Sequence, residues 1–407
     1  MNTTDFDGAR DARDTRTGPE RTGTERAAPE RDGAPDRDGG PTLGGPAALD
    51  AMRDQAVSIL PAWGLDPGDW RVVDVVMGSL TGDLRPVIET GGERFLFRRQ
   101  PPGIGEEALT FRHAWLRHLR AEGLPVPLPR PRPGGATHTL MADDAFELLE
   151  WRPGTRFAPD GPNNASALAA ASSMLGLLHQ ASAHFPGPAH RWPADRGPLA
   201  VADAYLDNLR RAAERPDISA AVSASTVRAA ESGTDRIALA ATALAARPGP
   251  PELHIHGDYR AHNLGFADDA VAGLYDFDAA HWARRVDELA YALICFTGLR
   301  EDESGGTEPQ ADDGLDIAKA HAFLRAYGAV APPADGESAL LGDALTLAFP
   351  IVLVNGIAED LVFADDFGGP PPDEAILPRL EWSNAFWPWI DRYRDVLAEA
   401  WTPSGAR

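Results

Sequence analysis

The fold of this chain is decided by LHIHGDYRAHN at residues 253–263 and by LYDFD at residues 274–278. In the first stretch an apolar run leads into Asp258, and Asn263 follows five residues later. A short buried strand is predicted at residues 271–275 and leads into the second stretch at Asp276, eighteen residues after Asp258. This order matches the chemistry of phosphoryl transfer, in which one carboxylate deprotonates an acceptor hydroxyl while an amide oxygen and a second carboxylate hold Mg²⁺.

Together the two stretches resemble the catalytic and metal motifs of the aminoglycoside phosphotransferase/choline kinase/homoserine kinase family, which is related to protein kinases. The resemblance implies that Asp258 is the catalytic base and that Asn263 and Asp276 are magnesium ligands. It also implies that Arg260 lies near the transferred phosphoryl group. The alternative is two ordinary turns flanking a strand, and the joint presence of both stretches at this distance favours the kinase interpretation.

Composition indicates a globular protein without a membrane segment. The 407 residues, 43% of them hydrophobic, suffice for two or three domains or for two lobes that share a cleft. No run of eighteen apolar residues is apparent and the chain is charged from Asp5 onward, so we expect neither a membrane span nor a signal peptide. The single cysteine, Cys295, lies in an apolar run, which favours a helix core and a cytoplasmic protein.

The net charge of −23 argues against a nucleic-acid partner, because binding a phosphate backbone needs clustered cations. It is compatible with a cationic substrate, although solubility explains it equally well. Of the 38 basic residues one is a lysine, Lys319, so the other 37 are arginines. No obligatory protein partner is evident from the sequence.

Residues 1–45 are rich in Asp, Arg, Gly, Thr and Pro and predict a disordered tail. After a predicted helix at 47–60, strand-like runs at 70–77, 84–90, 94–99, 137–141 and 146–150 predict one antiparallel sheet. The resemblance implies a protein-kinase-like two-lobed fold of the α/β (α+β) class, with a small N-terminal lobe at 46–150 and a mainly helical lobe at 151–407. Further helices are predicted at 105–121, 164–182, 201–213, 220–246, 286–296, 316–327, 338–363 and 377–401.

Three segments of the predicted N-terminal lobe are candidates for nucleotide binding. Gly78, Ser79 and Gly82 lie in a glycine-bearing turn that resembles the nucleotide-covering loop of the family. The resemblance implies that the third strand carries a cation that pairs with the phosphates of the nucleotide. No lysine precedes residues 253–263, so we expect Arg98 to be this cation, on the face of the strand opposite Phe97. The resemblance implies that the backbone of the hinge between the lobes, at Glu150, Trp151 and Arg152, binds the adenine ring of the nucleotide.

The helix after the third strand departs from the family pattern. Arg112 occupies the position at which members of the family usually have a glutamate, which pairs with the phosphate-binding cation of the third strand. We expect Arg112 to point outward, and Glu106, Glu107 or an acid of the magnesium site to approach Arg98 instead. The departure keeps open the alternative of a catalytically weak, kinase-like binding protein.

The acceptor site is the least determined part of the sequence. Asp278, Glu359 and Asp360 are candidate acceptor-binding acids, and carboxylates beside aromatic rings suit an ammonium-bearing substrate. Asn355, Trp382 and Trp387 are further candidates, although amphipathic helices commonly show the same pattern. Aminoglycosides, amino-alcohols such as choline and amino acids such as homoserine all remain open.

A zinc-dependent hydrolase that uses His254 and His256 is the remaining alternative, since the two histidines share one face of a strand. The absence of eight strand–helix repeats argues against the barrel that such an enzyme would need. The sequence therefore predicts an ATP- or GTP-dependent kinase that uses Mg²⁺ and phosphorylates a hydroxyl of a small molecule.

Overall fold

The structure is a computed structural model that describes residues 46–77, 84–100, 104–142, 144–157, 164–190, 198–247, 251–301, 307–366 and 368–402. The predicted tail at 1–45 and the glycine-bearing turn with Gly78, Ser79 and Gly82 lie outside these residues. We call residues 46–150 the N-terminal lobe and the following residues the C-terminal lobe.

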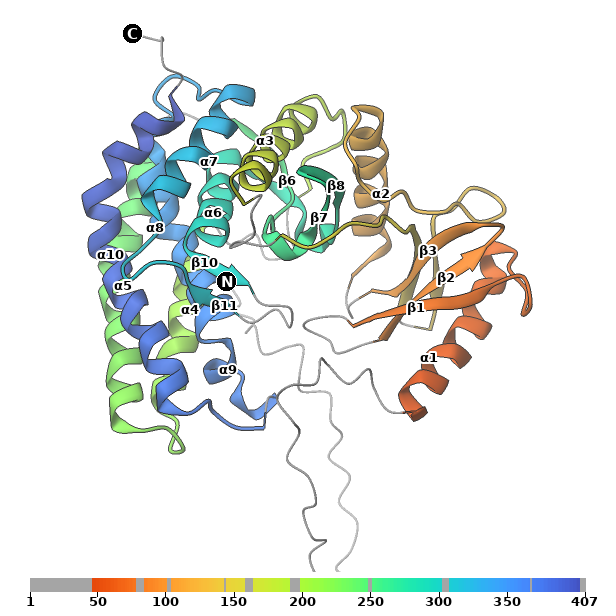
Figure 1. Cartoon of the computed structure of the whole chain (residues 1–407), viewed down its shortest axis with the longest axis horizontal. Helices are drawn as coiled ribbons and strands as arrows, with labels where there is room; N and C mark the ends of the chain where they lie inside the picture. Colours follow the sequence, from red (N-terminus) through yellow and green to blue (C-terminus); the bar gives the residue numbers. More distant parts are fainter. Residues whose placement is uncertain are drawn as a thin grey trace, which may run out of the picture. The chain divides into compact units, whose positions relative to one another are not determined.

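A five-stranded antiparallel sheet forms the N-terminal lobe, as the sequence predicts, with the strand order β1-β2-β3-β5-β4 (Figure 1). The strands are β1 (Arg71–Met77), β2 (Leu84–Thr90), β3 (Glu93–Arg99), β4 (His138–Met141) and β5 (Asp144–Glu150). Helix α1 (Pro46–Ile59) continues into the short helix η2 (Leu60–Trp63) and covers one face of the sheet. That face forms a small hydrophobic core of Ala56, Ile59, Leu60, Trp63, Leu65, Ile88, Phe95, Phe97, Phe146 and Leu148.

The opposite face of the sheet carries polar residues. Because side chains alternate along a strand, the burial of Phe97 and Phe146 against α1 turns their neighbours Arg98 and Glu147 to the other face. Arg98 and Glu147 are direct cross-strand partners in the register of β3 and β5. Both side chains are buried.

Helix α2 (Glu106–Ala121) belongs to both lobes by its packing. Gly105, whose backbone is extended, precedes its first turn as the N-cap residue. The apolar residues Phe111, Trp115 and Leu116 of α2 join the large hydrophobic core of the C-terminal lobe. The position of α2 is therefore fixed by the same core that includes Tyr259 and Ala261 of residues 253–278, which we call the catalytic segment after the role proposed for it from the sequence.

The C-terminal lobe is mainly helical. Helices α4, α5, α8 and α10 lie side by side, while α3 packs on α7 and on the strands β6 and β8 (Figure 1). The α-helices are α3 (Asn164–Ala183), α4 (Pro198–Ala213), α5 (Ala220–Ala246), α6 (Arg285–Thr297), α7 (Ile317–Val330), α8 (Leu341–Val352), α9 (Glu359–Val362) and α10 (Asp373–Trp401). Short helices occur at η3 (Ala261–Asn263), η4 (Phe277–Ala279), η5 (Ser338–Leu340), η6 (Leu353–Ile357) and η7 (Ala364–Asp366).

Pairs of short antiparallel strands frame the catalytic segment. Strand β6 (Glu252–Ile255) pairs with β9 (His281–Arg284), and β7 (Leu264–Ala267) pairs with β8 (Ala270–Leu274). The loop after β6 and the turn after β8 therefore meet at one place. A third pair, β10 (Leu299–Glu301) with β11 (Thr307–Pro309), lies after α6.

The single helix predicted at 338–363 is wrong, because the structure breaks it into several pieces. Pro350 lies inside α8 and has no backbone N–H to donate, and three residues later the chain widens into the π-helix η6. The backbone leaves the helical region at Ala358, and α9 begins at Glu359. The stretch Ser338–Ile357 is long and apolar enough to cross a membrane, with a mean hydropathy of 1.8, but 89% of it is buried inside the structure, as in a core helix.

Candidate active site

Asp258 is held by hydrogen bonds to both oxygens of its carboxylate. The Asn263 Nδ2 amide donates to Asp258 Oδ2 at 2.9 Å and to the Asp258 backbone carbonyl at 2.9 Å. The Tyr291 hydroxyl, on α6, donates to Asp258 Oδ1 at 2.6 Å. Sequence reasoning missed Tyr291, because nothing in an apolar helix pattern shows where one hydroxyl points.

The backbone before Asp258 is fixed by a buried carboxylate. Glu288 Oε2 accepts from the His256 N–H at 3.1 Å, and Glu288 Oε1 accepts from the Gly257 N–H at 2.6 Å. Burial acts to raise the pKa of Glu288, but contacts such as the one with His179, at 2.9 Å, outweigh it and hold the pKa below its ordinary value. Gly257 has a φ of 82°, and a Cβ there would clash with the Ala279 carbonyl, so this position requires glycine.

Asp287 and His179 have structural contacts near this segment. Asp287 lies in the first turn of α6 and pairs with Arg284 at 2.9 Å. His179 is a buried core residue, whose ring nitrogens contact the Tyr327 hydroxyl at 2.7 Å and Glu288.

Asp276 and Asp278 follow strand β8 and face the N-terminal lobe. Asp276 adopts a left-handed conformation with a φ of 56°, which is uncommon for a residue other than glycine and is found at functional sites. The Arg98 NH2 group donates to Asp276 Oδ1 at 3.3 Å and also to Asp278 Oδ2. Asp276, for which the resemblance implies a role as magnesium ligand, thus approaches Arg98, which is one of the alternatives expected from the sequence.

Arg98 is 4% exposed and lies among three carboxylates, the third being Glu147 at 3.6 Å. Burial acts to lower the pKa of Arg98, but the surrounding carboxylates outweigh it and hold the pKa well above its ordinary range. Arg98 is therefore a fixed positive charge at the boundary between the lobes.

The prediction that Arg112 points outward is wrong. Arg112 is 4% exposed, and its NH1 atom lies 2.6 Å from Asp278 Oδ1 and donates to Gln100 Oε1 at 2.9 Å. Repulsion from Arg98 does not expel it, because Asp278 lies between the two guanidinium groups. Glu106 and Glu107 are exposed and do not take part, and Glu106 lies 3.6 Å from His138 instead.

Glu147 provides the acid that helix α2 lacks. Its Oε2 atom lies 2.7 Å from His113 Nε2 of α2, and its Oε1 atom accepts from the Gln100 amide and faces Arg98. Burial acts to raise the pKa of Glu147, but His113 and the nearby arginines hold it below its ordinary value. The sequence contained a signal for this residue, since an acid in the apolar strand FELL at 146–149 needs a buried partner.

The oxygen donors around Asp276 fit a magnesium ion. Asn263 uses its amide nitrogen to hold Asp258, so its amide oxygen is the atom it offers to a cation. Asp276 is 38% exposed on its side chain, and Asp278 Oδ1 is a buried oxygen that lies near Arg112 without an aligned hydrogen bond. Mg²⁺ prefers such hard oxygens and takes only one or two carboxylates from protein.

The hinge segment is partly occupied by contacts within the protein. The Glu150 N–H donates to the Leu128 carbonyl at 2.9 Å and the Trp151 N–H donates to the Arg94 carbonyl at 2.8 Å. The Arg152 carbonyl accepts from the Tyr275 hydroxyl at 2.8 Å. A nucleobase would therefore have to use other groups of this segment.

Glu359 and Asp360, two of the candidate acceptor residues, both lie near arginines. Glu359, at the start of α9, lies where the charges of Arg260 and Arg379 act on it; burial nevertheless raises its pKa. Asp360 pairs with Arg379 at 3.2 Å.

The other candidate acceptor residues have contacts within the protein. Asn355, in the π-helix, donates to the Tyr205 hydroxyl at 3.2 Å. Trp382 and Trp387 are buried in the core and contact Phe349, so they do not line an open site.

Arg260 lies close enough to Tyr291 and to Glu359 for its positive charge to act on both. Its positive charge acts to lower the pKa of Glu359 and that of Tyr291, the hydrogen-bond partner of Asp258. Sequence position alone did not place Glu359 and Asp258 near one residue.

His254 and His256 have structural contacts. His254 Nε2 lies 3.1 Å from the Pro188 carbonyl, and His256 Nε2 lies 2.7 Å from the Tyr275 carbonyl. Within the described part of the chain, no three His, Cys, Asp or Glu side chains gather in a way that could hold a metal ion, which a zinc site would need.

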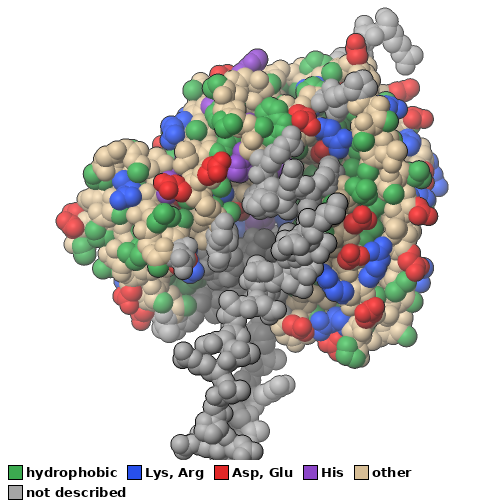
Figure 2. Space-filling model, turned by 180° about the vertical axis from the view of Figure 1, so that it is seen from behind, with side chains coloured by type: hydrophobic (Ala, Val, Ile, Leu, Met, Phe, Trp, Pro, Cys, Tyr) green, Lys and Arg blue, Asp and Glu red, His purple; other side chains and the backbone are tan. Residues whose placement is uncertain are grey.

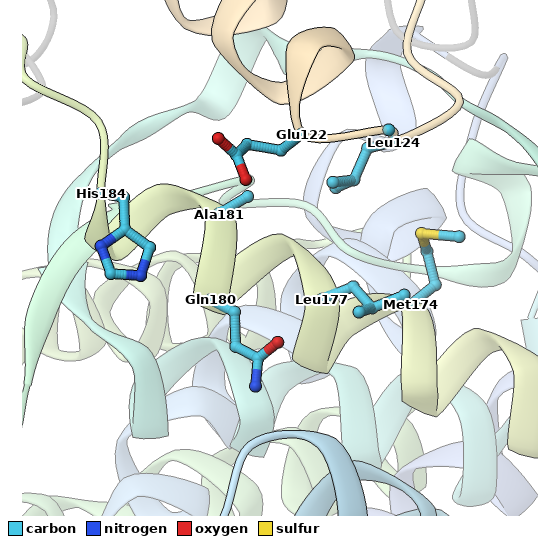
Figure 3. A pocket seen from close by; sticks show the side chains of 8 residues that line it. Glu122, Leu124, Met174, Leu177, Gln180, Ala181 and His184 are labelled. Carbon is cyan, nitrogen blue, oxygen red and sulfur yellow. The ribbon is translucent and has the colours of Figure 1, made fainter.

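Two surface features lie apart from these residues. A groove of about 460 Å³ between the end of α2 and α3 is lined by Glu122, Leu124, Met174 and Gln180, with no residue of the catalytic segment (Figure 3). On the face shown in Figure 2, the acidic and basic side chains of the described residues are interspersed rather than gathered by sign.

The fold and this arrangement of residues define a kinase-like phosphotransferase, and comparison with known proteins agrees. The model of the phosphotransferase enzyme family matches residues 85–333, more than half of the chain. The chain therefore belongs to the phosphotransferase enzyme family. It is a small-molecule phosphotransferase that acts on a hydroxyl acceptor, which confirms the resemblance inferred from the sequence.

Individual relatives and solved structures share 30% or less of their sequence with this chain. The chain is 30% identical over 280 residues to a homoserine kinase of Acidiphilium cryptum (strain JF-5), covering 67% of this chain and 74% of that protein. A microcompartment-associated aminopropanol kinase has the same fold, with a TM-score of 0.56, 13% identity and coverage of 86% and 98% of the two chains. A spectinomycin phosphotransferase in complex with ADP and spectinomycin gives a TM-score of 0.53 at 10% identity, with coverage of 84% and 98%.

Proposed function

We propose that this protein transfers the γ-phosphoryl group of ATP to the hydroxyl of a small amino-bearing metabolite, with homoserine as the first candidate. The proposal is supported by the hydrogen bond from Asn263 to Asp258 and by the contact of Asp276 with the buried cation Arg98. The Tyr275 N–H, next to Asp276, donates to the Asn263 carbonyl at 2.9 Å and so links the two pairs. The relative at 30% identity is a homoserine kinase. A structural neighbour binds ADP, which favours an adenine nucleotide as the donor.

In the proposed reaction Asp258 accepts the proton of the acceptor hydroxyl as its oxygen attacks the γ-phosphorus atom and the bond to the leaving ADP breaks. Tyr291 and Asn263 keep the Asp258 carboxylate in one orientation. Asn263, Asp276 and Asp278 would hold Mg²⁺, which supplies positive charge to the nucleotide phosphates. Arg98 binds the phosphates and Arg260 lies near the transferred group.

The acceptor is proposed to bind through its ammonium group to Glu359. Burial raises the pKa of Glu359 despite the nearby charges of Arg260 and Arg379, so a cationic ligand would stabilise its ionised form. Asp360 is already paired with Arg379 and would orient that arginine. Asp278, proposed from sequence for the acceptor, contacts Arg98 and Arg112 and is assigned here to the nucleotide side.

The test is turnover with Mg²⁺ and ATP on homoserine, choline and an aminoglycoside, followed by ADP release and by ³¹P NMR of the product. A phosphate monoester of homoserine, formed with the highest kcat/KM of the three, is the expected result. Preference for another acceptor would overturn the choice of homoserine. ADP release that equals the rate without acceptor for every hydroxyl compound would overturn the assignment as a kinase of this class.

A further inference from the structure

We propose that Arg112 is a second phosphate-binding residue of the nucleotide site, and that Asp278 holds it until Mg²⁺ and nucleotide bind. The inference rests on the proposed function, because it assigns a residue of the same site. It concerns the position at which this chain departs from the pattern of the family.

The first observation is the burial of an arginine that makes few contacts with acids. Arg112 is 4% exposed, and Asp278, at 2.6 Å, is its carboxylate partner. An arginine cannot shed its charge in a protein, so a buried guanidinium needs an anion beside it. Arg98, by contrast, has Glu147 in addition to the two aspartates that follow β8.

The second observation is that one carboxylate bridges two cations. Asp278 Oδ2 contacts Arg98 and Asp278 Oδ1 contacts Arg112, so the two guanidinium groups are separated by a single acid. A phosphate group presents oxygens in a similar way, and arginine binds phosphate and carboxylate with the same donors. Asp278 thus stands where an anionic group of the nucleotide would satisfy both arginines.

The third observation is the backing of Arg112 by neutral groups. Its NH1 group donates to the Gln100 amide oxygen at 2.9 Å, and the Gln100 amide nitrogen in turn donates to Glu147. Arg112 is therefore held on the sheet side of the site even when Asp278 turns away. If Asp278 turned to Mg²⁺, Arg112 would keep the Gln100 amide and the charge of Glu147 behind it, but would lose its directly contacting carboxylate, whose place a phosphate oxygen could take.

The experiment measures binding rather than turnover. Isothermal titration calorimetry gives the Kd of ATP in the presence of Mg²⁺, and the Kd of ATP and of adenosine with EDTA and without metal. The proteins compared are the wild type, Arg112→Ala, Arg112→Lys, Asp278→Asn and the control Arg99→Ala. Arg99 lies on the same strand as Arg98 but is 45% exposed on its side chain and pairs with Asp144, so its loss changes the charge equally without touching the site. Circular dichroism and melting curves establish that each variant folds.

Arg112→Ala should weaken ATP binding by about tenfold or more, as expected for a lost hydrogen bond to a charged group, and leave adenosine binding unchanged. Arg112→Lys should recover part of the loss because it restores the charge but not the fork of donors. Asp278→Asn should strengthen metal-free ATP binding, since it removes the competing anion. The gain should shrink in the Arg112→Ala background, because the two residues are coupled.

Equal effects of Arg112→Ala and Arg99→Ala would overturn the inference, as would an equal loss for adenosine and ATP, which would mean a structural role. Weaker metal-free ATP binding by Asp278→Asn would overturn the competition between Asp278 and phosphate. Failure of the wild type to bind ATP at all would overturn the proposed function together with the inference, and is thereby distinguishable from the other outcomes.

Discussion

The Tyr291 hydroxyl donates a hydrogen bond of 2.6 Å to Asp258 Oδ1, while Asn263 occupies the other carboxylate oxygen. Burial and the charge of Asp258 raise the pKa of Tyr291 well above its ordinary value, so the phenol stays protonated and remains a donor. Asp258 is therefore oriented from two sides before any acceptor arrives. The relationship links helix α6 to the base of the proposed reaction.

Removing this hydrogen bond should slow the reaction without affecting nucleotide binding. For Tyr291→Phe we expect kcat to fall by about tenfold, the effect of losing a hydrogen bond to a charged group, with the KM for ATP unchanged. The control is Tyr393→Phe, on α10, whose ring contacts Trp389. Wild-type kcat in Tyr291→Phe would show that Asn263 alone orients the base.

A second prediction concerns the acid that holds Arg98. Glu147→Gln keeps the shape of the side chain but leaves Arg98 and His113 without their buried carboxylate. The KM for ATP should rise by about tenfold, with the KM for the acceptor unchanged, because only the nucleotide side loses its orienting charge. Glu93→Gln, an exposed position on β3, serves as the control. An unchanged KM for ATP would mean that the aspartates after β8 suffice to place Arg98.

The sequence predicted the sheet and most helices because their alternating and helical patterns are local. It also singled out Asp258, Asn263 and Asp276 as candidate site residues, because their spacing lies within one continuous segment. It failed for Arg112 and Glu147, because their partners lie on other elements and depend on how α2 packs against the sheet. The break near Ala358 was missed because the apolar stretch Ser338–Ile357 leads directly into it and reads as one continuous helix; Pro350 was the available warning.

Glu288 should make stability depend on pH in a defined direction. Its pKa in the folded protein lies below the ordinary value of 4.5, so the stabilisation is fully present above that value and is lost as pH falls through the folded pKa. Glu288→Gln should lower the melting temperature at pH 7 and flatten its decline below about pH 4.5. The exposed Glu231→Gln is the control. A melting temperature that declines with acid equally in Glu288→Gln and wild type would contradict this role.

Glu359 should control the acceptor and not the nucleotide. In Glu359→Gln the KM for homoserine should rise by about tenfold, as expected for the loss of a charge-assisted contact, while the KM for ATP stays the same. Because burial raises the pKa of Glu359, the KM for the acceptor should increase in the wild type as pH falls toward that raised value. The exposed Glu381→Gln is the matched control. A wild-type KM for homoserine in Glu359→Gln would place the ammonium group elsewhere.

The most direct measurement is the turnover of Asp258→Asn on the acceptor that the wild type phosphorylates. The substitution keeps the size of the side chain and removes the proton acceptor, so kcat should fall by about a hundredfold or more, as expected for the loss of a positioned general base. The Kd of ATP and the melting temperature should remain at their wild-type values. Turnover near that of the wild type would remove Asp258 from the mechanism and contradict the account.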